Sequence, residues 1–216
     1  MKHLFLFSGL GADHRVFQFL DLSGFNVTYI KWLEPHARET MQHYAARLTA
    51  QIDAENPVLV GLSFGGMMAM EVAKHIATEK IVLISSAKTQ KEIPPYFRIA
   101  GKLKLNKIAA LTAAKKPNAR AYRMMGAETE TEKKLMKTIL TETDPVFFKW
   151  AIEKVVTWNN KVLHENVVHI HGTKDLLLPY RFVKADFSIE NGTHLMTVKN
   201  ANQVSEMLRK IISPVV

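Results

Sequence analysis

Short apolar segments separated by helical patterns are the feature that most limits the folds open to this chain. The segments are rich in aliphatic and aromatic residues, and they span 3–7, 26–32, 57–62, 80–85, 166–172 and 185–190. Patterns with the period of an amphipathic or buried helix lie between them in 39–54 and 64–77, and another follows the last segment in 199–212. Strands without a polar face that alternate with helices are typical of a parallel sheet covered on both sides. The sequence therefore predicts an α/β fold, a three-layer sandwich with about six parallel strands.

This alternation is interrupted once, after the fourth apolar segment. Residues 88–161 carry helical patterns and no strand pattern. Within them, Thr129 and Glu132 have the spacing of a capping box. Asp144 and Pro145 are a typical N-cap and first helical residue. We therefore expect an α/β core at 1–87 plus 162–216, with a helical cap at 88–161 inserted after the fourth strand.

The composition excludes several classes of site. The chain has 216 residues and no cysteine, so disulfides, thiolate metal sites and a cysteine nucleophile are excluded. No apolar run approaches the ~20 residues that cross a bilayer. A basic start before a short apolar run also occurs in leader peptides, but a strand followed by a loop explains residues 3–12 better. We expect a cytoplasmic protein with no membrane span, no metal and no cofactor.

The positive charge is concentrated in the middle of the sequence. The net charge is +9, and residues 88–161 hold 16 basic and 7 acidic residues, whereas the remainder holds 13 of each. Two interpretations stay open. The segment is a solvated helical surface, or it favours anionic substrates or partners. Its basic residues are interleaved with apolar ones at helical spacing, so nucleic acid is not the expected partner.

The stretch VLVGLSFGGMMAM, residues 58–70, places one serine between a predicted strand and a predicted helix. A turn between these elements is one explanation. The other is a strained elbow that exposes a nucleophilic serine, Ser63. In such an elbow the residues two before and two after the serine are crowded, which explains glycine at Gly61 and Gly65.

A serine nucleophile needs a base and an acid that orients the base. Asp175 follows the fifth predicted strand, and His194 lies in a loop after the sixth. Both positions are at carboxyl ends of strands, where a parallel sheet collects its ligand site. The alternative for Asp175 is a surface turn residue. We interpret His169 and His171, on one face of a strand, as structural histidines and not as zinc ligands.

These motifs together resemble the α/β-hydrolase superfamily over nearly the whole chain. GLSFGG resembles its nucleophile elbow, HGTKDLLLP its acid loop, NGTHLMT its histidine loop and FSGLGADHRVF its first loop. That loop more often begins His-Gly, whereas this chain has Ser8 and Gly9, which removes a side chain that helps to shape the loop. The chain opens on the strand usually counted third, so the resemblance implies a compact, six-stranded member.

The resemblance also implies roles for particular residues. Ser63 would attack the acyl carbon, His194 would carry the proton, and Asp175 would orient the imidazole. The backbone N–H groups of Phe64 and Leu10 would bind the oxyanion. The implied enzyme is a serine hydrolase of the carboxylesterase or thioesterase-like type. It would cleave an ester or related acyl bond of a small molecule through an acyl-serine intermediate.

Two further expectations concern the segment 88–161. As a lid over Ser63 it would supply an apolar acyl pocket, from residues among Met124, Met125, Phe147, Phe148 and Trp150. A second function class stays open beside the enzyme. In it, the fold is a non-catalytic binding protein whose basic helical segment contacts an anionic partner.

Overall fold

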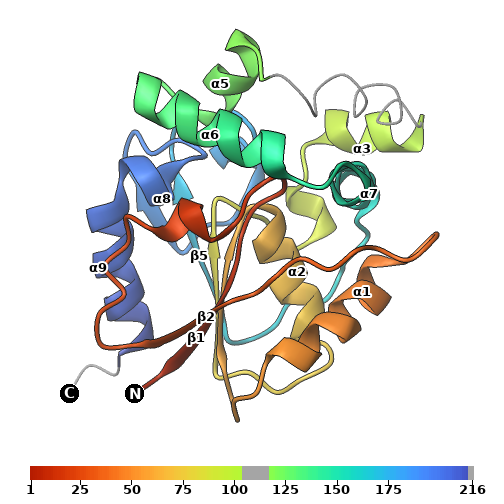
Figure 1. The fold of residues 1–216 in the computed structure, drawn as a ribbon. Helices are drawn as coiled ribbons and strands as arrows, with labels where there is room; N and C mark the ends of the chain where they lie inside the picture. Colours follow the sequence, from red (N-terminus) through yellow and green to blue (C-terminus); the bar gives the residue numbers. More distant parts are fainter. Residues whose placement is uncertain (104–116, 214–216) are drawn as a thin grey trace.

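Six parallel strands form one sheet at the centre of the molecule (Figure 1). The computed structural model describes residues 1–103 and 117–213. The strand order is β2-β1-β3-β4-β5-β6, and every neighbouring pair is parallel. The strands are β1 His3–Phe7, β2 Asn26–Tyr29, β3 Val58–Leu62, β4 Lys80–Ile84, β5 Val167–Gly172 and β6 Phe187–Ile189. The predicted α/β class and the six parallel strands are confirmed.

Helices cover both faces of the sheet, as the two-sided apolar strands predicted. On one face lie α1, Met41–Leu48, and α2, Phe64–Val72. On the other lie α8, Met196–Lys199, and α9, Ala201–Ile212 (Figure 1). A hydrophobic core lies on each face of the sheet, and alternate residues of β1 pack into one or the other. Phe5 and Phe7 pack with α1 and α2, whereas Leu4 and Leu6 pack with α9. This alternation follows from the two-residue period of a strand.

Several predicted elements are longer than the observed ones, and one strand and one helix illustrate the reason. The strand predicted at 26–32 ends at Tyr29, after which the chain turns so that the Trp32 indole reaches Ser8. The helix predicted at 64–77 ends at Val72, and Lys74 and His75 continue in tight turns. In both cases apolar residues beyond the element pack against the core without belonging to the regular structure.

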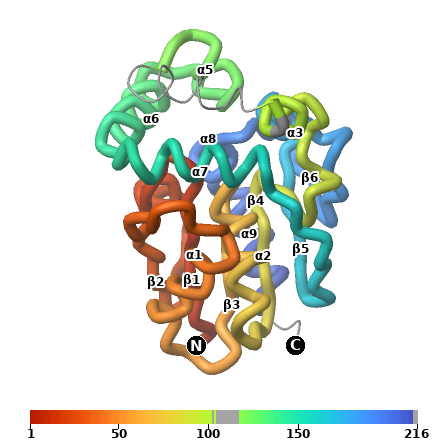
Figure 2. Tube along the Cα trace, turned by 90° about the vertical axis from the view of Figure 1, so that its right-hand side faces the viewer, coloured from red at the N-terminus to blue at the C-terminus, as the bar shows by residue number. Residues whose placement is uncertain are grey.

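Four helices in the described residues between β4 and β5 lie over the carboxyl ends of the strands (Figure 2). They are α3 Pro95–Lys102, α5 Ala119–Met125, α6 Glu130–Glu142 and α7 Pro145–Thr157. The predicted capping box is confirmed, because Thr129 accepts from the Glu132 N–H and the Glu132 carboxylate accepts from the Thr129 N–H. Asp144 caps α7 with Pro145 as its first residue, also as predicted. Among the described residues, no helix is long and apolar enough to cross a membrane.

Two tryptophans attach α7 to the core. The Trp150 indole packs 4.4 Å from the Tyr44 ring, centroid to centroid, and donates to the Glu39 carbonyl at 3.0 Å. At the other end of the helix, Trp158 Nε1 donates to Glu71 Oε1 at 2.7 Å. Glu71 lies fully buried in α2, where Lys74 Nζ contacts its second oxygen at 2.7 Å. Its charge is therefore balanced, and the α2 helix that follows Ser63 is joined directly to α7.

We expect Trp158→Phe to lower the free energy of unfolding by about 2–3 kcal/mol, because it leaves a buried carboxylate short of one donor. Urea unfolding at neutral pH measures this value. In a Glu71→Met background the same change should have a much smaller effect, since no carboxylate oxygen is then left without a partner. Equal effects in both backgrounds would show that packing of the indole, and not its hydrogen bond, is what matters.

Candidate active site

Ser63 occupies the turn between β3 and α2 in a strained backbone conformation. Its φ is 54° and its ψ is −120°, a region that non-glycine residues rarely adopt. Neighbours hold it there: the Ser63 N–H donates to the Ile84 carbonyl at 2.9 Å, and Ser86 Oγ donates to the Ser63 carbonyl at 2.6 Å. The elbow interpretation of this turn therefore fits its geometry, and the plain-turn interpretation does not account for the strain.

The two glycines around Ser63 are required for different reasons. A Cβ at Gly61 would lie 2.4 Å from the Gly66 Cα, at the start of α2. A Cβ at Gly65 would lie 2.1 Å from the Phe7 carbonyl oxygen and 2.3 Å from that of Ser8. The sequence suggested that the two positions crowd each other, and a Cβ at Gly61 would also lie 2.5 Å from the Gly65 carbonyl oxygen. The neighbour of Gly65 itself is the end of β1, which packs directly against the elbow.

His194 and Asp175 reach Ser63 from loops that follow β6 and β5. His194 Nε2 lies 2.8 Å from Ser63 Oγ, and His194 Nδ1 lies 2.7 Å from Asp175 Oδ2. Asp175 Oδ1 accepts the N–H groups of Leu177 and Leu178, both at 2.8 Å. Because that carboxylate is surrounded by donors, it accepts the Nδ1 proton of His194, and Nε2 is left free to accept from the serine hydroxyl. The structure thus brings the three predicted residues together in one row, in which Asp175 and His194 are buried and Ser63 is partly exposed.

The first loop is shaped by Ser8, where a histidine was the more common residue. Ser8 Oγ donates to the Ala12 carbonyl at 2.8 Å and accepts from Trp32 Nε1 at 3.0 Å. The loop therefore has a side chain that fixes its shape, contrary to what the departure from the usual pattern suggested. It passes close to the elbow, because a Cβ on Gly9 would lie 3.5 Å from the Ser63 Cβ.

Two backbone N–H groups are available beside Ser63. Phe64 is the first residue of α2, so its N–H has no acceptor within the helix. Leu10 follows Gly9 in the first loop. Neither N–H donates to an acceptor in the described part of the chain, and both residues line the cavity that contains Ser63. Their positions match those expected for oxyanion donors.

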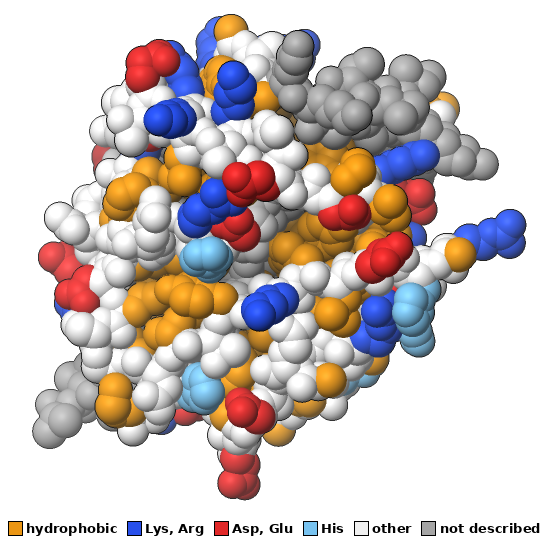
Figure 3. Space-filling model, viewed as in Figure 1, with side chains coloured by type: hydrophobic (Ala, Val, Ile, Leu, Met, Phe, Trp, Pro, Cys, Tyr) orange, Lys and Arg blue, Asp and Glu red, His pale blue; other side chains and the backbone are white. Residues whose placement is uncertain are grey.

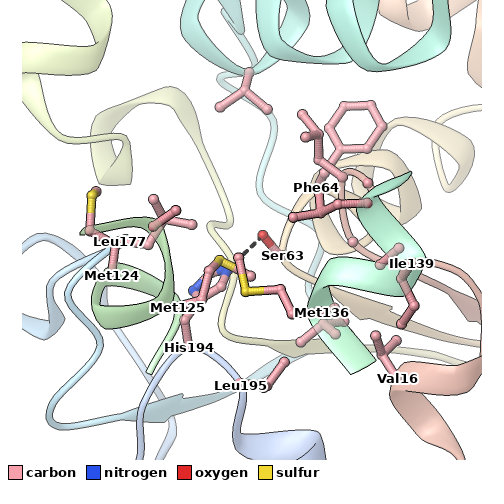
Figure 4. A pocket seen from close by; sticks show the side chains of 18 of the residues that line it. Val16, Ser63, Phe64, Met124, Met125, Met136, Ile139, Leu177, His194 and Leu195 are labelled. Atoms are coloured by element: carbon pink, nitrogen blue, oxygen red, sulfur yellow. Dashed lines mark hydrogen bonds between the residues drawn. The ribbon is translucent and has the colours of Figure 1, made fainter. Parts of the chain in front are cut away.

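The cavity above Ser63 is apolar and has a volume of about 340 Å³. Among its described lining residues, Ser63 and His194 carry the only polar side chains. Figure 4 shows their hydrogen bond surrounded by apolar side chains from several elements, including Val16, Phe64, Met124, Met125, Met136 and Ile139. Three of the cap residues predicted to line a pocket do line this cavity, namely Met124, Met125 and Phe148. Phe147 and Trp150 lie instead in the core cluster with α1 and α2.

The basic residues of 88–161 do not line this cavity in the part of the chain that the structure describes. Four cations, Arg123, Lys133, Lys174 and Arg181, line a different hollow on the other side of α5. Figure 3 shows Lys and Arg interspersed with Asp and Glu on the viewed face, without one continuous basic patch. Lys104 and Lys107 lie outside the described residues.

The remaining histidines have other environments. His14 is exposed, and Asp13 caps the short 3-10 helix η1, His14–Phe17. Among the described residues, His36, Glu39 and His43 bring ligand atoms within 4.8 Å of one another. The Glu39 carboxylate there already contacts His43 Nδ1 at 2.6 Å and Arg47 Nη1 at 2.8 Å. The guanidinium neutralises the carboxylate and disfavours a cation, so this cluster is explained as an ion-pair network.

Ser86 is a part of the site that the sequence did not indicate. Its hydroxyl supports the Ser63 carbonyl only because β4 lies beside β3 in the sheet. The inward-facing residues of α6, such as Met136 and Ile139, were likewise not assigned to the cavity. No local pattern marks these contacts, since each depends on how distant elements pack.

The site lies where the strand order reverses, between β1 and β3, with the first loop and Ser63 at their carboxyl ends. A parallel sheet with a strained, histidine-paired serine at this strand-to-helix turn defines the class of α/β hydrolases. The chain belongs to that family: the model described as "Alpha/beta hydrolase family" matches residues 3–201.

Solved structures share the fold at low sequence identity. A hydrolase from Pseudomonas aeruginosa PA01 aligns with a TM-score of 0.77 at 14% identity, over 98% of this chain and 90% of that chain. A thermophilic esterase from Thermogutta terrifontis aligns at 0.71 and 17%, over 98% and 90%. The enol-lactonase from Burkholderia xenovorans LB400 aligns at 0.69 and 14%, over 98% and 91%. No curated protein matches the sequence.

We expect Gly65→Ala to lower the free energy of unfolding by more than about 2 kcal/mol, because its methyl group would overlap two backbone carbonyl oxygens that cannot move without displacing β1. Gly9→Ala is the matched control, since its methyl would make an ordinary contact of 3.5 Å. Thermal and urea unfolding of both variants test this. Similar stabilities for the two would contradict the close approach between the elbow and β1.

Proposed function

We propose that this α/β hydrolase is a serine hydrolase that cleaves esters of uncharged, apolar carboxylic acids through an acyl-serine intermediate. The observation that carries the proposal is the row of hydrogen bonds from Ser63 through His194 to Asp175 at the floor of an apolar cavity. The solved structures that share this fold include an esterase and an enol-lactonase, and both of these act at an acyl carbon, which is compatible with the proposal.

In the proposed first step, Ser63 Oγ attacks the acyl carbon and its proton passes to His194 Nε2. Asp175 stabilises the imidazolium that forms. The negative charge that develops on the acyl oxygen is met by the N–H groups of Phe64 and Leu10, each worth roughly 3–4 kcal/mol in the transition state. The bond to the alcohol then breaks, and the leaving oxygen takes the proton from His194 Nε2.

In the second step, water attacks the acyl-serine and gives a proton to the same nitrogen. Breaking the ester bond to Ser63 releases the acid, and the proton returns to the serine oxygen. Ser63, His194 and Asp175 thereby return to their starting protonation states at the end of the cycle. The apolar surroundings strengthen both the ion pair and the oxyanion contacts, because electrostatic interactions are larger where water is excluded.

We also propose that 88–161 acts as a cap on a core made of 1–87 and 162–216. Helices α5, α6 and α7 supply Met125, Met136 and Phe148 to the cavity wall, and the core supplies Ser63 and His194. Methionine side chains are flexible and adapt to irregular apolar ligands. The cap would therefore accept several acyl chains of moderate size. A thioester would fit the same geometry, and the choice of leaving group is left to the test below.

The non-catalytic alternative accounts for fewer observations. A binding protein needs neither a strained serine nor a carboxylate that fixes the tautomer of a histidine beside it. Of the basic residues of 88–161 that were expected to contact an anionic partner, Arg123 and Lys133 line the hollow beyond α5, and none in the described part of the chain lines the cavity that contains Ser63. A protein of this kind would bind heparin in a salt-dependent manner and show no esterase activity.

We expect a phosphonate probe to label wild-type protein stoichiometrically at Ser63, as mapped by peptide mass spectrometry. Ser63→Ala should lose labelling and lower kcat by roughly 10⁴-fold or more, as nucleophile removal does in comparable triads. Its unfolding curve should match wild type, because the change removes one hydroxyl from a turn. Ser188→Ala, at an exposed serine of β6, is the control and should label normally. Labelling at any other serine would refute the assignment of the nucleophile.

The cavity lining predicts how acyl charge affects the rate. Of two esters with the same alcohol and chain length, the one with a terminal carboxylate on its acyl chain should have a kcat/KM at least about 100-fold lower. Burying an unpaired charge among apolar side chains costs several kcal/mol. Initial rates at 10 and 100 mM salt test this. Equal kcat/KM values for the two esters would instead favour contact with basic residues of 88–161, such as Lys102, Lys104 or Lys107. A fall in kcat/KM at high salt for the anionic ester alone would favour the same contact.

A further inference from the structure

Two histidines that the proposed chemistry does not use lie buried behind Asp175. His169 and His171 are on one face of β5, and neither is exposed to solvent. Their rings meet edge to face with centroids 4.9 Å apart, and His171 Nδ1 lies 3.0 Å from His169 Nε2. Imidazoles are costly to bury without partners. Their contacts therefore indicate what they do.

His171 contacts both ends of the acid loop. Its Nε2 lies 2.8 Å from the Leu178 carbonyl oxygen and 3.4 Å from Asp175 Oδ2. The N–H of Leu178 donates in turn to Asp175 Oδ1 at 2.8 Å. One nitrogen of His171 thus faces the carboxylate that binds His194 and also the backbone that holds this carboxylate in place.

The proton positions follow from these contacts. A carbonyl oxygen only accepts, so His171 Nε2 carries a proton and points it toward Leu178 and Asp175. In the neutral ring, Nδ1 must then accept, and its partner is the Nε2–H of His169. That tautomer leaves His169 Nδ1 as an acceptor, and this atom has no partner among the described residues. In the same tautomer, the protonated His169 Nε2 cannot accept a hydrogen bond from the Ser86 N–H, which lies 3.3 Å away.

Burial supports the neutral state of the pair. It lowers the pKa of His171, against the opposing charge of Asp175, and lowers the pKa of His169 well below its ordinary value. The charged and titratable groups that surround the pair are Asp175, His194, Lys88, Asp186 and Tyr180. Near pH 7 His171 therefore offers Asp175 a fixed N–H dipole and not a second positive charge.

We infer that His171 is a positioning residue for the acid, with His169 selecting the tautomer that directs its Nε2–H toward Asp175 and Leu178. The inference rests on the proposed function, in which Asp175 orients His194. It accounts for a buried histidine pair that packing alone would not require. Aliphatic side chains would fill the same space without leaving a polar atom unpartnered.

Two substitutions separate positioning from packing. His171→Gln places an amide N–H about where Nε2 lies, whereas His171→Asn reaches only to the position of Nδ1. Both are polar, neutral and unable to titrate near pH 7. We expect His171→Asn to lower kcat by about 10–100-fold with little change in KM, because a displaced acid misorients His194. His171→Gln should retain most of the wild-type kcat.

A structural role alone would leave the pH profile unchanged. In His171→Asn the acid limb of kcat/KM should move to higher pH, because Asp175 loses a donor and its less compensated charge favours protonated His194. In His171→Gln that limb should stay near its wild-type position. The inference would be overturned if both variants lost kcat equally and in proportion to their loss of thermal stability. It would also be overturned if His171→Asn kept a kcat and a pH profile close to those of wild type.

A second readout keeps this test separate from the hydrolase proposal. In full-length Ser63→Ala, proton NMR reports the Asp175–His194 hydrogen bond as a far-downfield resonance without any substrate. We expect this resonance to persist with His171→Gln and to shift or broaden with His171→Asn. If wild type hydrolyses no ester but the resonance responds in this way, the proposed function fails while the positioning role stands. An identical resonance in all proteins would reject the role of His171.

Discussion

The site depends on the close backbone approach between the end of β1 and the start of α2. The carbonyl oxygens of Phe7 and Ser8 occupy the space where a side chain at residue 65 would lie, so only glycine allows the two segments to meet. This contact places the first loop beside Ser63 and brings the N–H groups of Leu10 and Phe64 to the same cavity. The strained backbone of Ser63 persists because its surroundings hold it on both sides.

Around this contact, hydrogen-bond donors surround the Asp175 carboxylate. The Asp175 carboxylate is held by two backbone N–H groups, faces His171 on one side and binds His194 on the other. Above the row, the cap contributes apolar side chains, and its helix α7 is tied to the core through two indole hydrogen bonds. Rigid attachment below and adaptable methionines above would suit the proposed function, in which the reacting atoms are fixed and the acyl group varies.

Predictions from the sequence succeeded where the signal is local. The spacing of Gly61, Ser63 and Gly65 between two apolar runs indicated the elbow, because a strained turn restricts the residues at its own positions. The ends of the strand predicted at 26–32 and of the helix predicted at 64–77 were less accurate, since apolar residues such as Trp32 pack against the core whether or not they lie in regular structure. The contact between Ser8 and Trp32 was also missed, because the two residues are 24 positions apart in the chain.

The sequence by itself determined the α/β class, the parallel sheet, the insertion after the fourth strand and the order of Ser63, Asp175 and His194, since these depend on periodicity and on turn chemistry. Only the tertiary structure decided which of two adjacent cap residues faces the cavity. Phe147 packs in the core and Phe148 lines the pocket, because neighbouring helical residues point ~100° apart and the attachment of α7 sets its rotation. It alone also brought Ser86 to Ser63, because a sheet aligns strands that are distant in sequence, and it decided that the loop after β5 turns back so that Asp175 faces His171.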